Sequence, residues 1–384
     1  MKRLVKKNKV GRVRLFDQST GNPLQYWIVA THACRASFVG VVRDAWSRTR
    51  LAVRSSLLCV ILPVAAAVSL FTDTPFAQDQ SSPVKKIGAI WAGANAEEML
   101  PYSRPFMTRM RELGWIDGKS AQFIVRYYRY DAGKVPAIAR ELIAQNVDVF
   151  AVTAGNGACL SVREATKTVP IVCMDMFDPV LEGATSSLAR PNTNMTGVTW
   201  QSFDTAAKRV ELAKDLLPRL KRAALITDAT DQGAMIESQG FSEGAKKAGI
   251  RLDVFGLRGP RDFDAAIASI KNAPPDALIV AVNPLTIANL DRITALAVLV
   301  HVPTVSEIGD FARRGILLTY GVNIDETYSR AADLTHRILK GAKPRDLPFE
   351  QPTKFDLVVN LKTAKALGIK IPESIMLRAT EVIR

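Results

Sequence analysis

Cysteine and histidine are scarce in this chain of 384 residues, which has four of the first and three of the second. After residue 77 the histidines are His301 and His336, with no H-E-x-x-H motif and no third ligand at a useful spacing. A catalytic zinc site is therefore not expected. Cys159 and Cys173 lie fourteen residues apart and match no C-x-x-C motif. We expect both to be reduced and buried, although an oxidising periplasm would allow a disulfide between them.

Signatures of nucleotide binding and of hydrolysis are also missing. No Walker pattern is present, and no strand-like segment is followed by G-x-G-x-x-G. Residues 240–244 match G-x-S-x-G, but they lie inside a predicted helix, whereas a nucleophile elbow needs a tight turn directly after a strand. We therefore predict neither a cofactor nor catalysis by Ser242.

Acidic residues are outnumbered, since 51 Lys and Arg against 37 Asp and Glu give a net charge of +14. Residues 1–77 hold 12 basic and 3 acidic residues, which leaves 39 basic and 34 acidic residues in the remainder. Most of the basic surplus thus belongs to the first 77 residues. Nucleic-acid binding needs a concentrated basic surface, so the main body is not expected to bind nucleic acid.

The apolar run from Leu57 to Phe71 is too short for a membrane span, because it has about fifteen residues and a span needs roughly twenty. Together with Arg54 and Ala77 it matches a secretory signal over residues 54–77. Pro75 departs from the A-x-A pattern and leaves the cleavage point open. An uncleaved membrane anchor and a buried core helix are the alternatives.

Residues 1–53 show no clean helical or strand period. We interpret them as a mis-called start, with translation beginning near Val53. A basic DNA-binding arm and a long cytoplasmic n-region are the alternatives. No lipobox precedes Cys34 or Cys59, so a lipid-anchored form is not expected.

Strand-like and helical segments alternate along the roughly 300 residues that follow Gln78. Continuous apolar strands such as "ALIVAV" suit a parallel sheet that is covered on both faces. The intervening helices imply right-handed βαβ units. Because the series occurs twice, before and after about Trp200, we predict an α/β chain of two doubly wound parallel-sheet lobes. Pro101 and Pro105 are expected to delay the start of the helix in 97–114.

Small or polar residues recur where the predicted strands end, and ligands of such sheets gather beyond these carboxyl ends. Ordinary βα turns favour the same residue types, which is the alternative interpretation. The candidate ligand-binding residues are Trp91, Ala92, Gly93, Thr153, Ala154, Gly155, Asp178, Asp228, Asn283, Glu307 and Tyr320.

Three blocks of the sequence are distinctive: "ELGWIDGKSAQFIVRYY", "ATKTVPIVCMDMFDPVLEGATSSLARPNTNMTGVTW" and the tail from "ILKGAKPRDLPFEQ" to "MLRATEVI". Together they resemble one family, the bacterial ABC-transporter substrate-binding proteins that include tryptophan-binding members. The resemblance covers residues 86–383. Asn192 and Thr193 depart from it, since the family usually has a glycine pair there.

The resemblance implies a type I periplasmic-binding-protein fold, in which a three-strand hinge joins two lobes. The hinge would run through Thr196–Thr199, through the strand ending at Tyr320 and Gly321, and near Lys354–Asp356. Lobe one would combine 86–198 with about 322–350, and lobe two would combine 199–321 with about 351–384.

The resemblance also implies a function. The chain would be a periplasmic, monomeric solute receptor of an ABC importer, which delivers a small molecule, such as an amino acid or related organic acid, to an inner-membrane permease. A ligand-sensing regulator with the same core is one alternative. An enzyme that uses cleft carboxylates is another, with Asp175, Asp178 and Glu307 as candidates.

Two of the candidates receive specific roles. Trp91 follows the first strand and could form an apolar wall for the ligand, with core packing as the alternative. Asp178 follows a buried strand and could bind a ligand ammonium, with capping of the next turn as the alternative.

Overall fold

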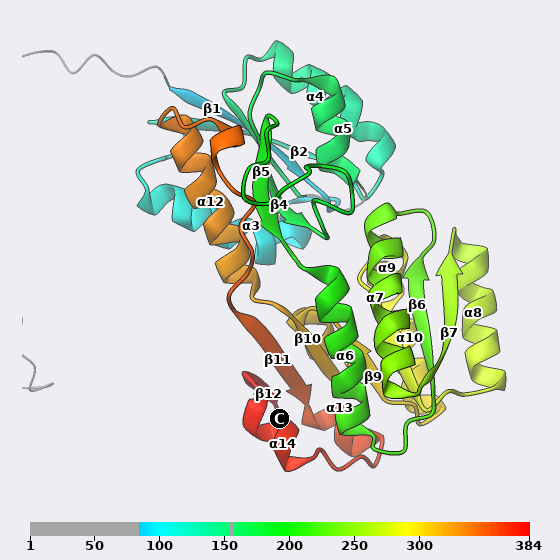
Figure 1. The fold of residues 1–384 in the computed structure, drawn as a ribbon. Helices are drawn as coiled ribbons and strands as arrows, with labels where there is room; N and C mark the ends of the chain where they lie inside the picture. The colour runs from blue at the N-terminus through cyan, green and yellow to red at the C-terminus, as the bar shows by residue number, and fades with distance from the viewer. Residues whose placement is uncertain (1–83, 154–156) are drawn as a thin grey trace, which may run out of the picture. The chain divides into compact units, whose positions relative to one another are not determined.

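The computed structural model describes residues 84–153 and 157–384 (Figure 1). The predictions for residues 1–53 and 54–77, and those for Ala154 and Gly155, concern residues outside this part of the chain. Residues Ser81–Arg384 form one compact unit. None of the described helices is both long enough and apolar enough to cross a membrane.

The first sheet has five parallel strands in the order β2-β1-β3-β4-β5. Its inner strands are buried along most of their length because they are apolar on both faces. The strands are β1 (Lys85–Trp91), β2 (Ala121–Tyr127), β3 (Val149–Val152), β4 (Ile171–Met176) and β5 (Met195–Thr199).

Helices cover both faces of this sheet, and together they form the first lobe. One core lies between the sheet and the helices α3 (Ala96–Glu112) and α12 (Ile324–Leu339). The other lies under α4 (Val135–Ala144) and α5 (Ala158–Ala165). The helix α12 therefore packs beside α3, although more than two hundred residues separate them in the sequence (Figure 1).

The second sheet has seven strands in the order β12-β11-β10-β9-β8-β6-β7. All neighbouring strands are parallel except β10 and β11. The strands are β6 (Arg222–Asp228), β7 (Arg251–Leu257), β8 (Ala277–Val280), β9 (Thr304–Ser306), β10 (Leu318–Val322), β11 (Phe355–Asn360) and β12 (Glu381–Ile383).

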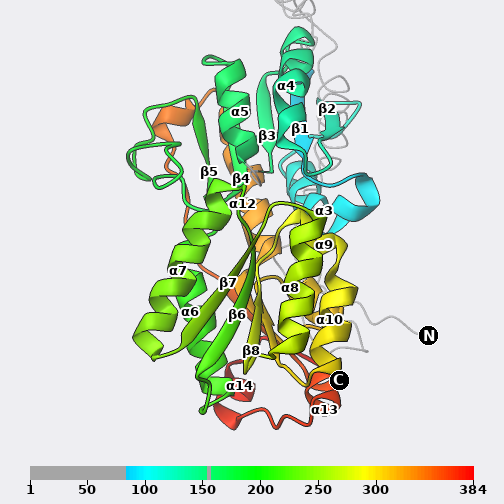
Figure 2. The same cartoon turned by 90° about the vertical axis from the view of Figure 1, so that its right-hand side faces the viewer.

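This sheet and its helices form the second lobe. The helices α6 (Ser202–Leu216) and α7 (Gln232–Ala248) cover one face, and α8 (Pro260–Asn272) and α10 (Leu290–Leu299) cover the other (Figure 2). The remaining elements are short: η1 (Ala132–Lys134), α9 (Pro284–Ala288), α11 (Gly309–Arg313), η3 (Pro344–Asp346), α13 (Leu361–Ala366) and α14 (Glu373–Arg378). The two sheets with helices on both faces confirm the predicted α/β fold of two lobes.

Three segments of the chain pass between the lobes. The first leads from β5 into α6, the second from β10 into α12, and the third from η3 into β11. Hydrogen bonds join them, since the Thr199 amide donates to the Glu350 carbonyl at 2.9 Å and the Asn323 amide donates to the Lys354 carbonyl at 3.0 Å. The lobe boundaries given from the sequence stay predictions.

The antiparallel pair of β10 and β11 differs from the all-parallel prediction. Val322 at the end of β10 lies opposite Phe355 at the start of β11. After β10 the chain crosses to the first lobe, where it forms α12, and it then returns to the second sheet as β11, at the end where β10 stops. Because β11 starts beside the end of β10, the two neighbouring strands must run in opposite directions.

Two further predictions were wrong. The helix α3 begins at Ala96 and contains Pro101 and Pro105, because Asn95 caps its first turn and accepts a hydrogen bond from the Glu98 amide. Cys159 on α5 and Cys173 on β4 form a disulfide, with their Cα atoms 6.1 Å apart. Both cysteines are buried as expected, but they are oxidised, which is the alternative that the sequence left open. The sequence could not decide between the two states because helix and strand meet only in the folded lobe.

Candidate functional site

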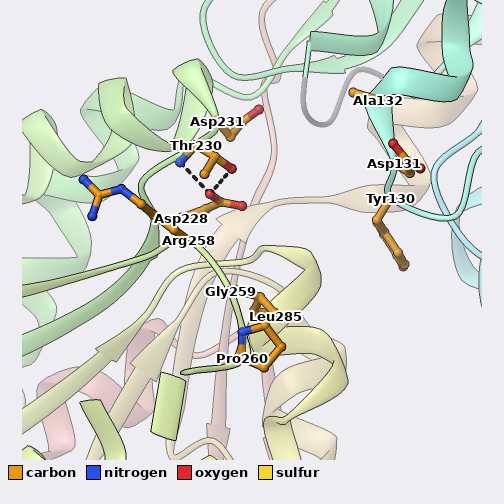
Figure 3. A pocket seen from close by; sticks show the side chains of 10 residues that line it. All are labelled: Tyr130, Asp131, Ala132, Asp228, Thr230, Asp231, Arg258, Gly259, Pro260 and Leu285. Carbon is orange, nitrogen blue, oxygen red and sulfur yellow. Dashed lines mark hydrogen bonds between the residues drawn. The ribbon is translucent and has the colours of Figure 1, made fainter. Parts of the chain in front are cut away.

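A cavity of about 430 Å³ lies where the carboxyl ends of the two sheets face each other (Figure 3). The loops after β2, β6, β7 and β8 contribute its walls. This is the place where doubly wound sheets bind ligands. The residues that line it are Tyr130, Asp131, Ala132, Asp228, Thr230, Asp231, Arg258, Gly259, Pro260 and Leu285.

On the first lobe, the backbone holds Tyr130 in an unusual conformation. Arg129 and Tyr130 have φ values of 54° and 56°, in the left-handed region that residues other than glycine rarely adopt. Their amides donate to the carbonyls of Gly93 at 3.2 Å and Ala92 at 2.7 Å, which fixes this loop against the loop after β1. Such outliers persist where the surrounding structure determines them, often at ligand sites.

The phenol of Tyr130 is also fixed. Its hydroxyl donates to the carboxylate of Glu98 at 2.6 Å, and the second oxygen of Glu98 accepts from the Ala94 amide at 2.7 Å. Burial raises the pKa of Tyr130, and the hydrogen bond to Glu98 raises it further. The side chain is therefore a neutral phenol at physiological pH, with its ring at the cavity wall.

On the second lobe, two buried carboxylates lie close together in sequence. Asp228 ends β6, is 8% exposed, and accepts from the amide and the hydroxyl of Thr230 at 2.7 and 2.6 Å. Asp231 is 7% exposed and caps α7 by accepting from the Ala234 amide at 2.8 Å. Burial raises the pKa of Asp231, and the nearby charge of Asp228 adds to this effect.

Among the predicted residues that the structure describes, which exclude Ala154 and Gly155, only Asp228 lines this cavity. Trp91 is 1% exposed, stacks on Tyr328 at 6.5 Å between ring centroids and meets the edge of Phe106 at 6.0 Å. Ala92 and Gly93 hold the Tyr130 loop through their carbonyl oxygens. They therefore support the cavity wall without lining it.

Thr153 and Asn283 are buried beside their own strands. The Thr153 amide donates to the Ile90 carbonyl at 3.0 Å. Asn283 caps α9 by accepting from the Thr286 amide at 3.0 Å, and the Thr286 hydroxyl accepts from the Asn283 amide. The Thr153 amide thus continues the pairing of β3 with β1, and Asn283 begins a helix, so a direct ligand contact by either stays a prediction.

Asp178 occupies a tight turn after β4. One carboxylate oxygen accepts from the amides of Val180 at 3.0 Å and Leu181 at 2.9 Å, while the Asp178 amide donates to Glu182 at 2.8 Å. These contacts favour the capping alternative. Its role toward an ammonium stays a prediction that calorimetric titration of Asp178→Asn with the identified ligand can test.

Glu307 and Tyr320 face the interior of the second lobe. Glu307 is buried 3.4 Å from the guanidinium of Arg209, which also lies 2.6 Å from Glu237. Tyr320 stacks on Phe355 at 5.8 Å between ring centroids. Asp175, the remaining carboxylate considered for catalysis, accepts from the Tyr328 hydroxyl at 2.8 Å.

Sequence reasoning missed several lining residues, among them Tyr130, Asp231 and Arg258. Arg258 directly follows β7, and Tyr130 lies three residues after β2. Asp231 directly precedes α7, where an aspartate is a helix-cap signal. Applying the strand-end rule to every predicted strand would have included all three.

The cavity can enclose an organic molecule of moderate size, since ligand pockets commonly measure about 300–1,000 Å³. In residues 84–153 and 157–384, no group of three or more His, Cys, Asp or Glu side chains is placed to hold a metal ion.

Residues 99–383 match the profile of a family described as ABC transporter substrate binding protein. The chain belongs to this family. Members of the ABC transporter substrate-binding protein family are extracytoplasmic solute receptors rather than enzymes, and they work with membrane permeases.

Individual proteins are similar to this chain in sequence or in fold. A tyrosine-binding protein of Clostridioides difficile is 25% identical over 275 residues, which are 69% of this chain and 76% of the relative. A conserved domain protein of Vibrio cholerae has the same fold, with a TM-score of 0.73, 23% identity, and coverage of 78% of this chain and 99% of the other. An ABC domain of Streptococcus pneumoniae in complex with L-Trp gives a TM-score of 0.72 at 23% identity, with coverage of 78% and 100%.

Proposed function

We propose that this substrate-binding protein takes up a small organic solute in the cavity between its sheets and delivers it to an inner-membrane ABC permease. The observation that carries the proposal is the cavity itself. It lies at the strand ends of both lobes, and the first lobe presents a fixed aromatic ring to it. The receptor acts as a monomer, without enzymatic activity and without nucleic acid.

The proposed compartment is the periplasm, reached through the predicted signal at 54–77. The disulfide between Cys159 and Cys173 supports this, because structural disulfides persist in oxidising compartments and are rare in the cytosol.

The proposed ligand is an amino acid or a related organic compound. Two relatives carry names that point in this direction, a tyrosine-binding protein and an ABC domain in complex with L-Trp. In this chain, the ring of Tyr130 and the apolar side chain of Leu285 both line the cavity and can contact the carbon skeleton of such a molecule.

Native mass spectrometry of protein purified from a periplasmic extract tests the proposal. We expect one small organic molecule to be retained per chain and released on unfolding. Tyr130→Ala should lower the retained fraction at least tenfold. Tyr127→Ala is the matched control, because Tyr127 is half-buried near the same strand end and does not line the cavity. A chain that retains no solute, and that no solute stabilises in a thermal screen, would contradict the proposal.

A further inference from the structure

Three nearly buried carboxylates lie in or near the cavity without a counter-ion. Asp228 and Asp231 line it, and Glu182, 6% exposed, lies in the loop after β4. Glu182 is close enough to Asp231 for that charge to raise its pKa. Within residues 84–153 and 157–384, no Lys, Arg or His side chain forms an ion pair with any of the three.

The other buried carboxylates of the described chain have a positively charged partner. Glu237 and Glu307 are also almost fully buried, and Arg209 lies between them at 2.6 and 3.4 Å. The second lobe thus provides a cation where it buries acids inside its own core. It provides none for Asp228 and Asp231, which lie at the cavity.

Burying a carboxylate without a partner is costly, because the charge loses its hydration. Local hydrogen bonds offset part of this cost, from Thr230 to Asp228 and from Ala234 to Asp231. They supply no positive charge. Figure 3 shows Asp228, Thr230 and Asp231 grouped on one wall of the cavity, so a cation inside the cavity can reach this wall.

The other residues that line the cavity do not neutralise the charge of Asp228 and Asp231. The lining contains three aspartates and one cationic side chain, Arg258. Arg258 is exposed, and Figure 3 shows its guanidinium directed away from Tyr130 and Asp131. The cavity therefore has an excess of negative charge, which favours a positively charged occupant.

A metal ion does not suit this wall, since the described carboxylates do not converge in a group of three. An ammonium or guanidinium group does suit it. Its several N–H donors point in different directions and can reach two separate carboxylates, and such charge-assisted hydrogen bonds are the strong ones.

We infer that the ligand of this receptor carries an ammonium or guanidinium group, and that this group binds to Asp228 and Asp231. The inference rests on the proposed function and names the chemical class of its ligand. It places the ammonium partner on the second lobe, at the carboxyl end of β6 and in the turn that follows, and not at Asp178 in the first lobe.

A thermal-shift screen with matched compounds provides the first test. The panel contains L-tyrosine, L-tryptophan, tyramine, tryptamine and agmatine, the deaminated acids 3-(4-hydroxyphenyl)propionate and indole-3-propionate, and a set of neutral sugars. We expect each compound that raises the melting temperature to carry an amine or a guanidinium group. We expect the deaminated acids and the sugars to have no effect.

Variants then locate the group. Asp228→Asn and Asp231→Asn keep side-chain size and an oxygen acceptor, and asparagine is as good a helix cap as aspartate. Each should weaken calorimetric binding of the best amine at least tenfold. Asp264→Asn is the matched control, because Asp264 lies on α8 of the same lobe, is exposed, pairs with Arg292 and does not line the cavity. It should change the affinity less than threefold.

The unliganded variants give an independent readout. Removing an unpaired buried charge should leave the melting temperature of Asp228→Asn and Asp231→Asn unchanged or higher, which separates lost binding from lost folding. Stabilisation by the deaminated acids or the sugars, or full affinity for the amine in both variants, would overturn the inference while leaving the receptor function intact. A panel in which no compound of any class binds would instead count against the proposed function.

Discussion

Trp91 is a residue whose surroundings favour a structural role. Its ring is 1% exposed and packs between Tyr328 and Phe106 in the core of the first lobe. Trp91→Ala should lower the free energy of unfolding by about 3–5 kcal/mol, the usual cost of removing a buried Trp or Phe side chain. Urea denaturation measures this.

Trp115→Ala is the matched control in the same lobe, because Trp115 is only half-buried and donates to His336 at 3.0 Å. It should cost clearly less than Trp91→Ala. An unaltered midpoint for Trp91→Ala, together with weaker ligand binding, would instead support the role at the cavity wall.

Glu182 makes the stability of the unliganded protein depend on pH. Burial raises the pKa of Glu182 to about 8, from a model-peptide value of 4.5, and the charges of Asp231 and Asp178 contribute to the rise. The folded protein therefore keeps this proton between about pH 4.5 and 8, while the unfolded chain has already lost it. Stability from this group is fully present below pH 4.5 and is lost as the pH rises toward 8.

Glu182→Gln should remove this loss. A shift of the pKa from 4.5 to about 8 corresponds to a loss of stability of roughly 5 kcal/mol at most. Between pH 5 and pH 9, we therefore expect the free energy of unfolding of Glu182→Gln to rise by at least about 1 kcal/mol relative to that of the wild type. Urea denaturation at both pH values checks this. Glu164→Gln, on the exposed side of α5, is the control and should follow the wild-type profile. Parallel profiles for all three proteins would show that Glu182 titrates normally.

At the scale of elements, the packing of α6 against α7 depends on glycine. A Cβ atom at Gly240 would overlap the carbonyl oxygen of Phe203, and one at Gly244 would lie 2.8 Å from the Cα atom of Ala207. Both neighbours are backbone atoms, which cannot move aside as a flexible side chain could. The glycines of the G-x-S-x-G match thus serve helix packing.

Gly240→Ala should therefore destabilise the protein by about 1–3 kcal/mol, the range for overpacking, even though alanine favours a helix by about 1 kcal/mol. Ser242→Ala on the exposed side of the same helix is the control, and it should be neutral or slightly stabilising. Thermal unfolding of both variants checks this. A stabilised Gly240→Ala variant would mean that the two helices can separate at little cost.

Strands that are buried on both faces could be predicted from the sequence, because they appear in it as continuous apolar runs, as β8 does. Pro101 and Pro105 show where local rules fail. Prolines inside a helix weaken it, yet packing of Phe106 and Met110 into the first-lobe core favours the helical conformation of α3. The disulfide was named only as an alternative for a related reason, since no spacing rule brings α5 and β4 together.

At the scale of the whole molecule, the position of the candidate cavity could be predicted, but most of the side chains that line it could not. The carboxyl ends of both sheets followed from the alternation of strands and helices. The sequence could not show that Trp91 and Glu307 face the interior, because the side-chain direction at a strand end depends on what packs against it. It also could not show that Tyr130 is held at the cavity by carbonyls from another loop.

The division of the chain leads to a prediction about its mature form. Residues Ser81–Arg384 form a unit of their own, and the predicted signal at 54–77 precedes them. The exported protein should therefore begin near Gln78. A chain that starts there should have the same melting temperature and ligand affinity as the protein purified from the periplasm. Intact-mass spectrometry of the periplasmic protein measures where it begins.

Two substitutions test the signal itself. Val60→Arg places a charge in the apolar run, where a charged residue costs about 2.5–3.5 kcal/mol on insertion scales, so export should fail and the uncleaved chain should accumulate in the cytoplasm. Ser55→Arg is the matched control, because it adds the same charge beside Arg54, in the region where a signal is normally basic. Export of Ser55→Arg with retention of Val60→Arg would confirm the signal. Equal export of both variants, or Met1 on the periplasmic protein, would show that the run from Leu57 to Phe71 does not direct export.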